Sequence, residues 1–593
     1  MDAVALAEAL GSSKAALSIL ALRLAEEAGW IPRGRCASIE SAGELAAEAR
    51  ALRIRTGGAL PPHPLPSRLR SDAWREALRV EPVPLSAAAE ALLAREMGRA
   101  RRRAAGVYFT PPDLAAAVVE LGLLRGGVGR GELPRVFDPC AGAGAFLEAA
   151  ALALAPRCSR VAAALLCGGA DLSADALAAA RAALALVAGP QARAADLAAL
   201  RFDQLDSLWS SSEPADLIVS NPPYGHVDDP RLAARWPALR GGEIDRYAAF
   251  ILRSLELARP GGTVALLVPD TWMWKSRGAP LRRAILDSAD IAALVDLGKP
   301  FAAAKDTRVQ ALVMVRRRTR RTTFVGRREG GRVAPLAPAR LRGSEGQGWQ
   351  PYRTRGEADL CAAMEAASVP LGALCSVGYG LRTGRNALHV APGPGRVGLL
   401  GGEDIVPFAL RWRPKHLIDG SPRLEALAKR QLGRPRIAVQ RIRTNSGAPH
   451  ARWLEAAVAP PELVCLDSLS TLASPDEDRL WALLALLCSS PVNRYHRLRT
   501  TDVNVKPALL ARLPAPRRLA EDGGARELAA LARARALEAS VEPQRRNAPA
   551  PALERAIDAA VYDLYGLDPA LIDVAERGHW GPRFAEERAR LPG

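Results

Sequence analysis

Several short apolar runs between residues 136 and 224 each end in an acidic or amide residue, and most are followed by helical apolar spacing. The residues at these ends are Asp138, Asp171, Asp196 and Asn221. Strands that alternate with helices form open parallel sheets, and the carboxyl ends of parallel strands meet at one edge. A single acid is more often a helix cap or a surface residue, but the repeated placement favours a binding edge. The pattern therefore predicts an α/β fold with a ligand site at these ends.

The last run leads into Asn221-Pro222-Pro223-Tyr224. The Asn221 side-chain oxygen and the Pro222 carbonyl can accept both N–H bonds of a planar exocyclic amine, which favours a tetrahedral nitrogen with an available lone pair. The ring of Tyr224 can stack on the ring that carries the amine. The alternative is a simple turn leaving a buried strand, because proline is preset for such a bend. The rest of the chain has to separate these two interpretations.

A glycine turn follows the first strand in Asp138-Pro139-Cys140-Ala141-Gly142-Ala143-Gly144. Glycine permits close approach of a ligand to the backbone, and an acid at a strand end can accept bonds from a ligand amine. The dinucleotide-binding fingerprint requires a third glycine, which is missing here. Upstream, Tyr108-Phe109-Thr110-Pro111-Pro112 precedes a helical pattern, and we expect Thr110 to be the N-cap.

The pattern divides the chain into five parts. We expect a helical amino-terminal region at 1–95, an α/β domain at 96–320, a linker or mobile loop at 321–360, a further domain at 361–520 and a helical tail at 521–593. Within the α/β domain, further strands are expected at 161–170, 263–268, 291–297 and 309–315. A length of 593 residues is compatible with several domains.

The net charge of +18 favours a polyanionic partner, because basic side chains that neutralise phosphates release counterions. Only seven of the 81 basic residues are lysine, so a biased genome is an alternative explanation. The eight cysteines form no Cys-x-x-Cys pair, which argues against zinc and disulfides, and we expect no metal site. We expect neither a signal peptide nor a membrane span, and therefore a cytoplasmic location.

With these motifs in order, residues 99–318 resemble the TaqI-like, gamma-ordered adenine-N6 DNA methyltransferases of restriction-modification systems. The resemblance implies an α/β fold with the Rossmann-like sheet of the methyltransferases that depend on S-adenosylmethionine. It also implies an amino-terminal helical region and a carboxy-terminal α+β target-recognition domain. The expected substrate is double-stranded DNA, and a separate nuclease or other defence subunits are possible partners.

The resemblance assigns roles to individual residues. It implies that Asn221, Pro222, Pro223 and Tyr224 are catalytic, and that Phe301 contacts the extruded base, although a core phenylalanine is the alternative. The implied cofactor-binding residues are Tyr108, Thr110, Pro111, Asp138, Ala141, Gly142, Gly144, Asp171 as the ribose acid and Asp196 as the acid that contacts adenine. This chain has Leu197 where family members often carry phenylalanine.

The carboxy-terminal half resembles target-recognition domains by pattern more than by identity. The candidate DNA contacts are Arg382, Arg385, Arg441 and Arg443, each of which could also be a phosphate or surface arginine. We find no Asp…Glu-x-Lys nuclease pattern, because none of the seven lysines has an acid two places before it. The rival functions are methylation of cytosine N4, an RNA base or a protein glutamine, and a catalytically silent DNA-specificity subunit.

Overall fold

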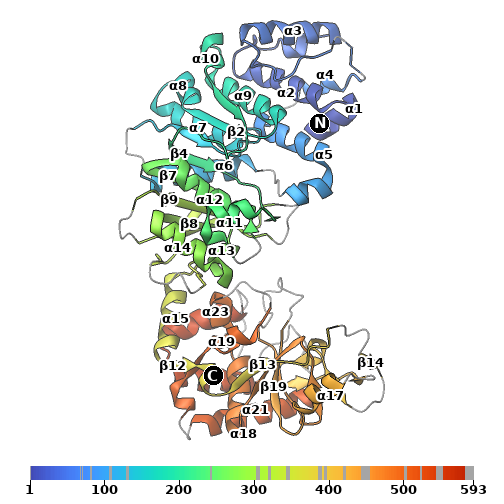
Figure 1. Cartoon of the computed structure of the whole chain (residues 1–593), viewed down its shortest axis with the longest axis vertical. Coiled ribbons are helices and arrows are strands. Elements are labelled where there is room, and N and C mark those ends of the chain that lie inside the picture. Colours follow the sequence, from blue (N-terminus) through green and yellow to red (C-terminus); the bar gives the residue numbers. More distant parts are fainter. Residues whose placement is uncertain are drawn as a thin grey trace. The chain divides into compact units, whose positions relative to one another are not determined.

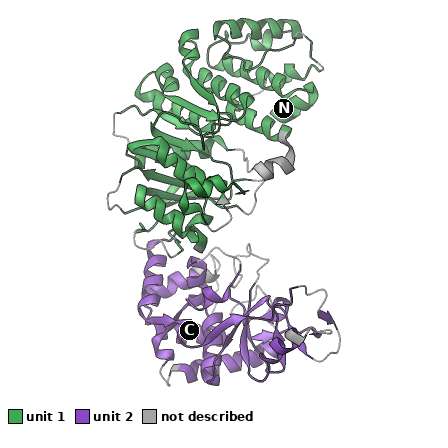
Figure 2. Ribbon diagram, in the orientation of Figure 1, with its two compact units in different colours: residues 1–352 green, residues 353–593 purple. Residues whose placement is uncertain are grey.

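The computed structural model forms two units, residues 1–352 and 353–593, shown in green and purple in Figure 2. The structure describes residues 2–66, 68–69, 71–79, 83–105, 110–127, 132–240, 244–301, 307–317, 322–341, 348–384, 390–392, 397–417, 422–441, 454–499, 504–520, 524–541 and 552–580. No described helix has both the length and the apolar composition needed to cross a membrane.

Helices form the amino-terminal part of the first unit, as its alanine- and leucine-rich composition predicts. They are α1 (Ala3–Leu10), α2 (Ser13–Glu27), α3 (Ala42–Arg55), α4 (Ala73–Ala77) and α5 (Leu85–Ala105). Asp2, Ser12 and Ser41 cap the first three by accepting hydrogen bonds from backbone amides of the first turn. Their apolar side chains belong to the same hydrophobic core as the neighbouring sheet, so this region and the sheet are packed as one body.

A nine-stranded sheet forms the centre of the first unit (Figure 1). Its order is β11-β10-β8-β9-β7-β4-β1-β2-β3. The bounds are β1 (Val136–Asp138), β2 (Cys167–Asp171), β3 (Arg201–Gln204), β4 (Ala215–Ser220), β7 (Ala258–Pro269), β8 (Asp290–Gly298), β9 (Val309–Val315), β10 (Phe324–Glu329) and β11 (Arg332–Pro335). Strands β1, β2, β3, β4 and β7 run parallel, and β9 runs antiparallel to both of its neighbours.

The strand order reverses between β1 and β4, and this reversal positions the site. The connection from β1 to β2 and the connection from β4 to β7 lead in opposite directions along the sheet, and parallel crossovers are right-handed, so their helices cover opposite faces. The main helices of this part of the chain are α6 (Pro112–Arg125), α7 (Ala145–Leu154), α8 (Arg160–Leu165), α9 (Ala174–Ala188), α11 (Pro230–Arg235), α12 (Arg246–Leu257), α13 (Thr271–Trp274) and α14 (Ala279–Ser288). Ligands in such sheets bind beside the reversal, at the carboxyl ends of the strands.

Two expectations for the first unit are wrong. The expected strand at 161–170 begins only at Cys167, because residues 160–165 form α8 with Ser159 as its N-cap. Part of the expected linker at 321–360 is ordered sheet, since β10 pairs in parallel with β8 and antiparallel with β11. Val325 of β10 is fully buried, so this strand packs into the sheet between β8 and β11 despite its arginine-rich sequence.

The second unit has its own hydrophobic core. One four-stranded sheet contains β13 (Ser376–Tyr379), β22 (Leu469–Ala473), β19 (Arg436–Gln440) and β20 (Ala456–Ala459), and another contains β14 (Val390–Pro392), β18 (Lys415–Leu417), β15 (Gly398–Leu400) and β21 (Leu463–Cys465). Its helices include α15 (Arg355–Ala366), α17 (Pro422–Lys429), α18 (Glu477–Cys488), α19 (Ser490–Arg499), α21 (Gly524–Val541), α22 (Ala552–Tyr565) and α23 (Pro569–Trp580).

The expected recognition domain and the expected helical tail share this core. Leu528 and Ala532 of α21 and Val561 of α22 are buried in the same cluster as Leu483 of α18. The tail therefore packs on the recognition-like part and is not a separate body. The finer boundaries at residues 95, 320 and 360 stay predictions.

Candidate active site

The glycine turn after β1 is held by the Asp138 carboxyl group. Asp138 is 1% exposed, and its Oδ1 accepts hydrogen bonds from the Cys140 amide at 2.9 Å and from the Ser220 hydroxyl at 2.6 Å. Burial raises its pKa to about 7. Because Ser220 ends β4, this carboxyl group ties together the two strands on either side of the reversal.

Two glycines shape the turn, as the sequence predicts. Gly142 has φ +51° and Gly144 has φ +91°, a region that side-chain-bearing residues rarely adopt. A Cβ on Gly144 would lie 2.9 Å from the Ala180 backbone, so only glycine lets α7 approach α9 this closely. Ala141 is buried, and its amide donates to the Ala170 carbonyl at the end of β2. The glycine turn is therefore held against the end of β2.

Asp171 lies at the end of β2, as expected for the ribose acid. Its Oδ2 accepts a hydrogen bond from the Gly142 amide at 2.9 Å, and its Oδ1 accepts one from the Ser173 amide at 2.9 Å. The expected strand-end acids 138 and 171 thus meet at one turn.

Asp196 does not end a strand, and this expectation is wrong. It lies in the short helix α10 (Ala194–Ala198), where its carboxylate bonds to the backbone and guanidinium of Arg193. Strand β2 pairs with β1 on one side and with β3 on the other, and Asp206 follows β3. The amide of Leu205, next to Asp206, donates a hydrogen bond to the Asp171 carbonyl at 3.2 Å, which places Asp206 near the end of β2. The structure therefore brings Asp206 to the site in place of Asp196.

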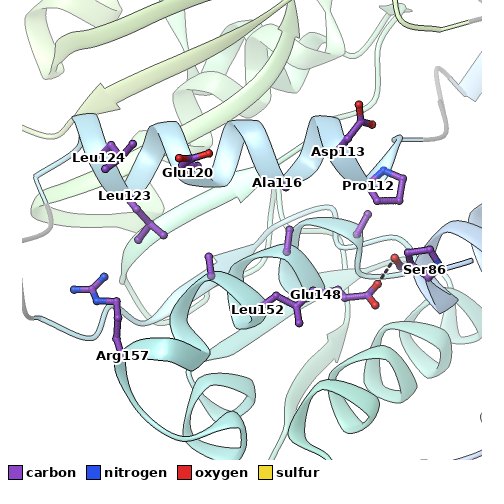
Figure 3. A pocket seen from close by; sticks show the side chains of 14 residues that line it. Ser86, Pro112, Asp113, Ala116, Glu120, Leu123, Leu124, Glu148, Leu152 and Arg157 are labelled. Atoms are coloured by element: carbon purple, nitrogen blue, oxygen red, sulfur yellow. Dashed lines mark hydrogen bonds between the residues drawn. The ribbon is translucent and has the colours of Figure 1, made fainter. Parts of the chain in front are cut away.

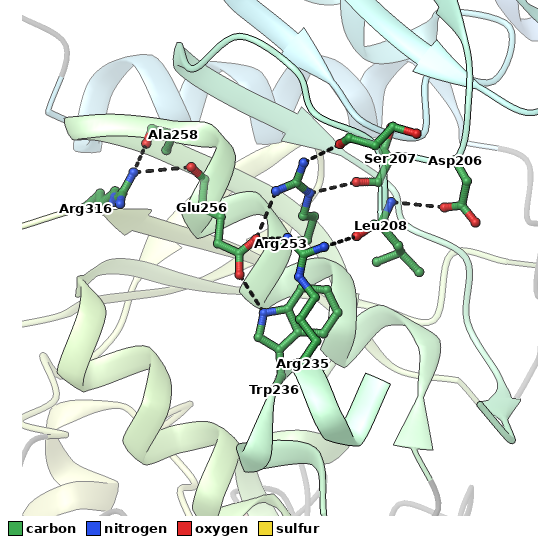
Figure 4. Close-up of polar contacts among 10 residues, drawn as sticks. Asp206, Ser207, Leu208, Arg235, Trp236, Arg253, Glu256, Ala258 and Arg316 are labelled. Atoms are coloured by element: carbon green, nitrogen blue, oxygen red, sulfur yellow. Dashed lines mark hydrogen bonds and ion pairs between the residues drawn. The ribbon is translucent and has the colours of Figure 1, made fainter. Parts of the chain in front are cut away.

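The loop that carries Asp206 is held in place by α12 (Figure 4). The buried Arg253 side chain donates from Nε to the Ser207 carbonyl at 2.7 Å and from Nη2 to the Ser210 carbonyl at 2.6 Å. Arg235 donates to the Leu208 carbonyl, and both guanidinium groups form ion pairs with Glu256. These contacts fix residues 207–210, directly after the acid.

The amide of Asn221 is connected to the segment that precedes α6. Its Nδ2 donates to the Thr110 hydroxyl oxygen at 2.9 Å, although 111 residues separate the two positions. Pro111, and not Thr110, is the N-cap of α6, so the expected capping role is wrong. The buried hydroxyl of Thr110 instead orients the amide of the Asn-Pro-Pro-Tyr motif. The two motifs that the sequence separates therefore form one site.

The aromatic residues of the motif lie in contact. Tyr224 is 5% exposed, and its hydroxyl donates to the Leu267 carbonyl at 3.3 Å. Its ring meets Tyr247 and Phe301 edge-on, each at a centroid distance of 6.2 Å. Pro222 is buried and Pro223 is half-buried beside this group. Phe301 thus lies next to Tyr224, and in this conformation no ring fits between them.

The remaining candidate residues are Tyr108 and the four arginines of the carboxy-terminal half. Tyr108, Arg385 and Arg443 lie outside the described residues. Arg382 is exposed and pairs with Asp467 at 3.6 Å, and Arg441 donates to the Asp467 carbonyl and to Asn504. The Arg441 guanidinium also lies 5.2 Å from the centre of the half-exposed Tyr379 ring. Arg441 is therefore engaged in contacts within the second unit, whereas Arg382 presents its charge to solvent.

A cavity of about 850 Å³ opens between α6 and α7 (Figure 3). Its lining is mainly apolar and includes Ala116, Leu123 and Leu152, with Glu148 bonded to Ser86. None of the residues at the strand ends lines it. The cavity is therefore distinct from the candidate site.

The geometry at the strand ends fits S-adenosylmethionine. The turn at Gly142 is open, since a Cβ built there would meet only the Glu90 carboxylate, at 3.9 Å. Asp138, Asp171 and Asp206 surround this turn, and ribose hydroxyls and amines are groups that carboxylates bind. Within the part of the chain that the structure describes, no His, Cys, Asp and Glu side chains gather as a metal site.

Sequence reasoning missed two residues at this site. Asp206 ends no long apolar run, and only the pairing of β3 with β2 identifies it. Glu90 lies in α5, far from every motif, and its Oε2 accepts a hydrogen bond from the Thr110 amide at 2.7 Å. No local pattern of the sequence marks either residue.

The sheet order and these strand-end residues define the fold of the S-adenosylmethionine-dependent methyltransferases. Residues 85–335 match the model of the N-6 DNA Methylase family. The match covers the sheet, the glycine turn and the Asn-Pro-Pro-Tyr motif.

Two type II methyltransferases match part of the chain. The chain is 30% identical over 230 residues to the type II methyltransferase M.TthHB8I of Thermus thermophilus, covering 35% of this chain and 51% of that protein. It is 30% identical over 98 residues to M.BanIII of Aneurinibacillus aneurinilyticus, covering 16% and 17%. The chain thus spans about half the length of the first relative and less of the second.

One solved structure resembles the fold over almost the whole chain. The type IIL restriction-modification enzyme MmeI, solved in complex with DNA, has a TM-score of 0.58 and 12% identity, covering 97% of this chain and 96% of that one. At this identity the likeness concerns the fold alone.

Proposed function

We propose that this protein is a site-specific DNA methyltransferase that transfers a methyl group from S-adenosylmethionine to adenine N6. The observation that carries the proposal is the hydrogen bond between Asn221 and Thr110. It joins the Asn221 amide to the Thr-Pro-Pro segment, so the acceptor amine and the methyl donor would meet at one strand edge. Effective catalysis of this kind depends mainly on alignment.

In the proposed reaction, the Asn221 side-chain oxygen and the Pro222 carbonyl accept the two N–H bonds of adenine N6. This leaves the nitrogen lone pair directed at the methyl group, which the sulfonium of the bound cofactor activates. The target adenine leaves the duplex and stacks on Tyr224. Because Phe301 now touches Tyr224 edge-on, entry of the base must part these two rings.

We assign the cofactor to the same edge, at the carboxyl ends of the strands. We propose that Tyr108, Thr110 and Pro111 hold the methionine part together with Asp138, Ala141, Gly142 and Gly144. Asp171 holds the ribose, and Asp206 takes the adenine-contacting role first expected for Asp196. Of the two arginine candidates that the structure describes, Arg382 is the stronger as a DNA contact, since its side chain is 75% exposed.

The wider setting belongs to the same proposal. The relatives are named type II methyltransferases, which supports a place in a restriction-modification or other defence system. A separate nuclease or further subunits would then be partners, and the expected location is the cytoplasm.

Sequencing of host DNA that detects modified bases tests the proposal. Expression of the wild-type protein should produce N6-methyladenine at one recognition sequence, whereas Asn221→Ala should abolish it while cofactor binding, measured by calorimetry, stays within about threefold. Nucleoside mass spectrometry separates N6-methyladenine from N4-methylcytosine. Normal methylation by Asn221→Ala would disprove the site, and a wild-type protein that binds the cofactor but modifies no DNA would favour a silent specificity subunit.

A further inference from the structure

Glu90 of α5 reaches the cofactor edge from the amino-terminal helical region. Its Oε2 accepts a hydrogen bond from the Thr110 amide, and its Oε1 lies 3.9 Å from where a Cβ on Gly142 would stand. The carboxyl group is therefore placed between the Thr-Pro-Pro segment and the open glycine turn. Glu90 retains partial exposure, in contrast to the fully buried Asp138.

The neighbouring acids are already committed to contacts within the protein. Asp138 accepts bonds from Cys140 and Ser220, and Glu148 accepts one from Ser86. The charges that act on Glu90 are those of Asp138 and Glu148, both acidic. With burial they raise the pKa of Glu90 to about 8. A carboxyl group in such surroundings is stabilised as the anion when a cation binds beside it.

We propose that the Glu90 carboxylate is the counter-ion for the ammonium group of the methionine part of S-adenosylmethionine. This inference rests on the proposed function and deepens it. The methionine part is the portion of the cofactor expected beside Thr110 and the glycine turn, and its ammonium group is a three-fold hydrogen-bond donor. Charge-assisted hydrogen bonds are the stronger class, so one such contact has a measurable effect on affinity.

The inference gives the amino-terminal helices a role in cofactor binding. Helix α5 contacts α7, α9 and α2, and Trp30, which follows α2, donates to the Ala185 carbonyl of α9 at 3.3 Å. Lys14 of α2 pairs with Asp175 of α9 at 2.7 Å. Helix α5 is thus packed against α2 and α9, and the two polar contacts join α2 to α9, so the amino-terminal helices hold Glu90 in position.

The test compares two ligands by calorimetry on the full-length protein. S-adenosylhomocysteine carries the ammonium group, whereas 5′-methylthioadenosine lacks the amino-acid part. Glu90→Gln keeps an acceptor for the Thr110 amide but removes the charge. We expect it to weaken S-adenosylhomocysteine at least about tenfold and to leave 5′-methylthioadenosine within about twofold. Glu96→Gln, an exposed position on the same helix, is the matched control and should bind both ligands normally.

The outcomes separate this inference from its alternatives. Unchanged binding of S-adenosylhomocysteine by Glu90→Gln would overturn the assignment. Equal weakening of both ligands would also overturn it, because Glu90 would then support the shape of the site. If the wild-type protein binds S-adenosylhomocysteine but methylates no DNA, the proposed function fails while the binding comparison still decides the role of Glu90.

A measurement on the wild-type protein covers the case in which Glu90→Gln does not fold. An ammonium group beside Glu90 favours its anion, so a proton is released on binding. Calorimetry at pH 7.5 in buffers of different ionisation enthalpy should show about half a proton more released with S-adenosylhomocysteine than with 5′-methylthioadenosine. Equal release with the two ligands would contradict the proposal. Asp138 and Glu148 are the other titratable groups that act on Glu90.

Discussion

Two carboxyl groups beside the glycine turn, those of Glu90 and Asp138, couple this site to pH. Burial raises the pKa of Glu90 to about 8 and that of Asp138 to about 7. In the unfolded chain both groups titrate near about 4. Between these values the folded protein holds protons that the unfolded chain has lost, which stabilises the fold. This contribution is fully present below the unfolded pKa values and is lost as the pH rises through 7 and 8.

We therefore expect the thermal midpoint of the ligand-free protein to fall between pH 6 and pH 9. Glu90→Gln should flatten this decline, because a neutral amide no longer ionises, and Glu96→Gln should keep the wild-type slope. Differential scanning fluorimetry across this range measures both. Parallel curves for wild type and Glu90→Gln would show that Glu90 titrates normally.

At the scale of elements, side chains of helix α12 hold the loop after β3, which contains Asp206. Arg253 lies on the buried side of α12 and bonds to two carbonyl groups of this loop. The guanidinium donates three hydrogen bonds, and the one to Glu256, at 2.9 Å, is also an ion pair. Asp206, at the start of the loop, depends on these contacts for its position.

Arg253→Ala should destabilise the protein by about 2 to 4 kcal/mol, because it leaves buried carbonyl groups without a donor. We also expect weaker binding of S-adenosylhomocysteine, since Asp206 loses its support. Chemical denaturation and calorimetry measure the two effects.

Arg193→Ala provides the comparison. It removes only the surface pair with Asp196, so stability and cofactor binding should stay unchanged. A loss of cofactor binding in Arg193→Ala, with none in Arg253→Ala, would restore the role first expected for Asp196.

At the scale of the whole molecule, the net charge of +18 favours a polyanionic partner, such as the DNA of the proposed function. Basic side chains that neutralise phosphates make affinity strongly dependent on salt. The abundance of arginine in a chain with few lysines also reflects composition, so the charge alone does not identify the contacts.

We expect DNA affinity to fall by about 10³-fold or more between 50 and 200 mM salt if six or more phosphates are contacted. Arg382→Ala should reduce the slope of log affinity against log salt by about one. Fluorescence anisotropy with a labelled duplex measures both. An unchanged slope in Arg382→Ala would show that this side chain does not contact a phosphate.

The sequence by itself determined the sheet, the glycine turn and the Asn-Pro-Pro-Tyr motif, because alternation of apolar runs with helical spacing and the residues of tight turns are local properties. It also placed Asp138, Asp171 and Asn221 correctly at strand ends. Tertiary structure decided that Asp206, and not Asp196, follows the strand that pairs with β2. It also decided that the arginine-rich β10 lies in the sheet and that the Thr110 hydroxyl accepts a hydrogen bond from Asn221. Those outcomes depend on residues that are distant in sequence, such as Thr110 and Asn221 or Glu90 and Gly142, and no local pattern specifies which of them meet.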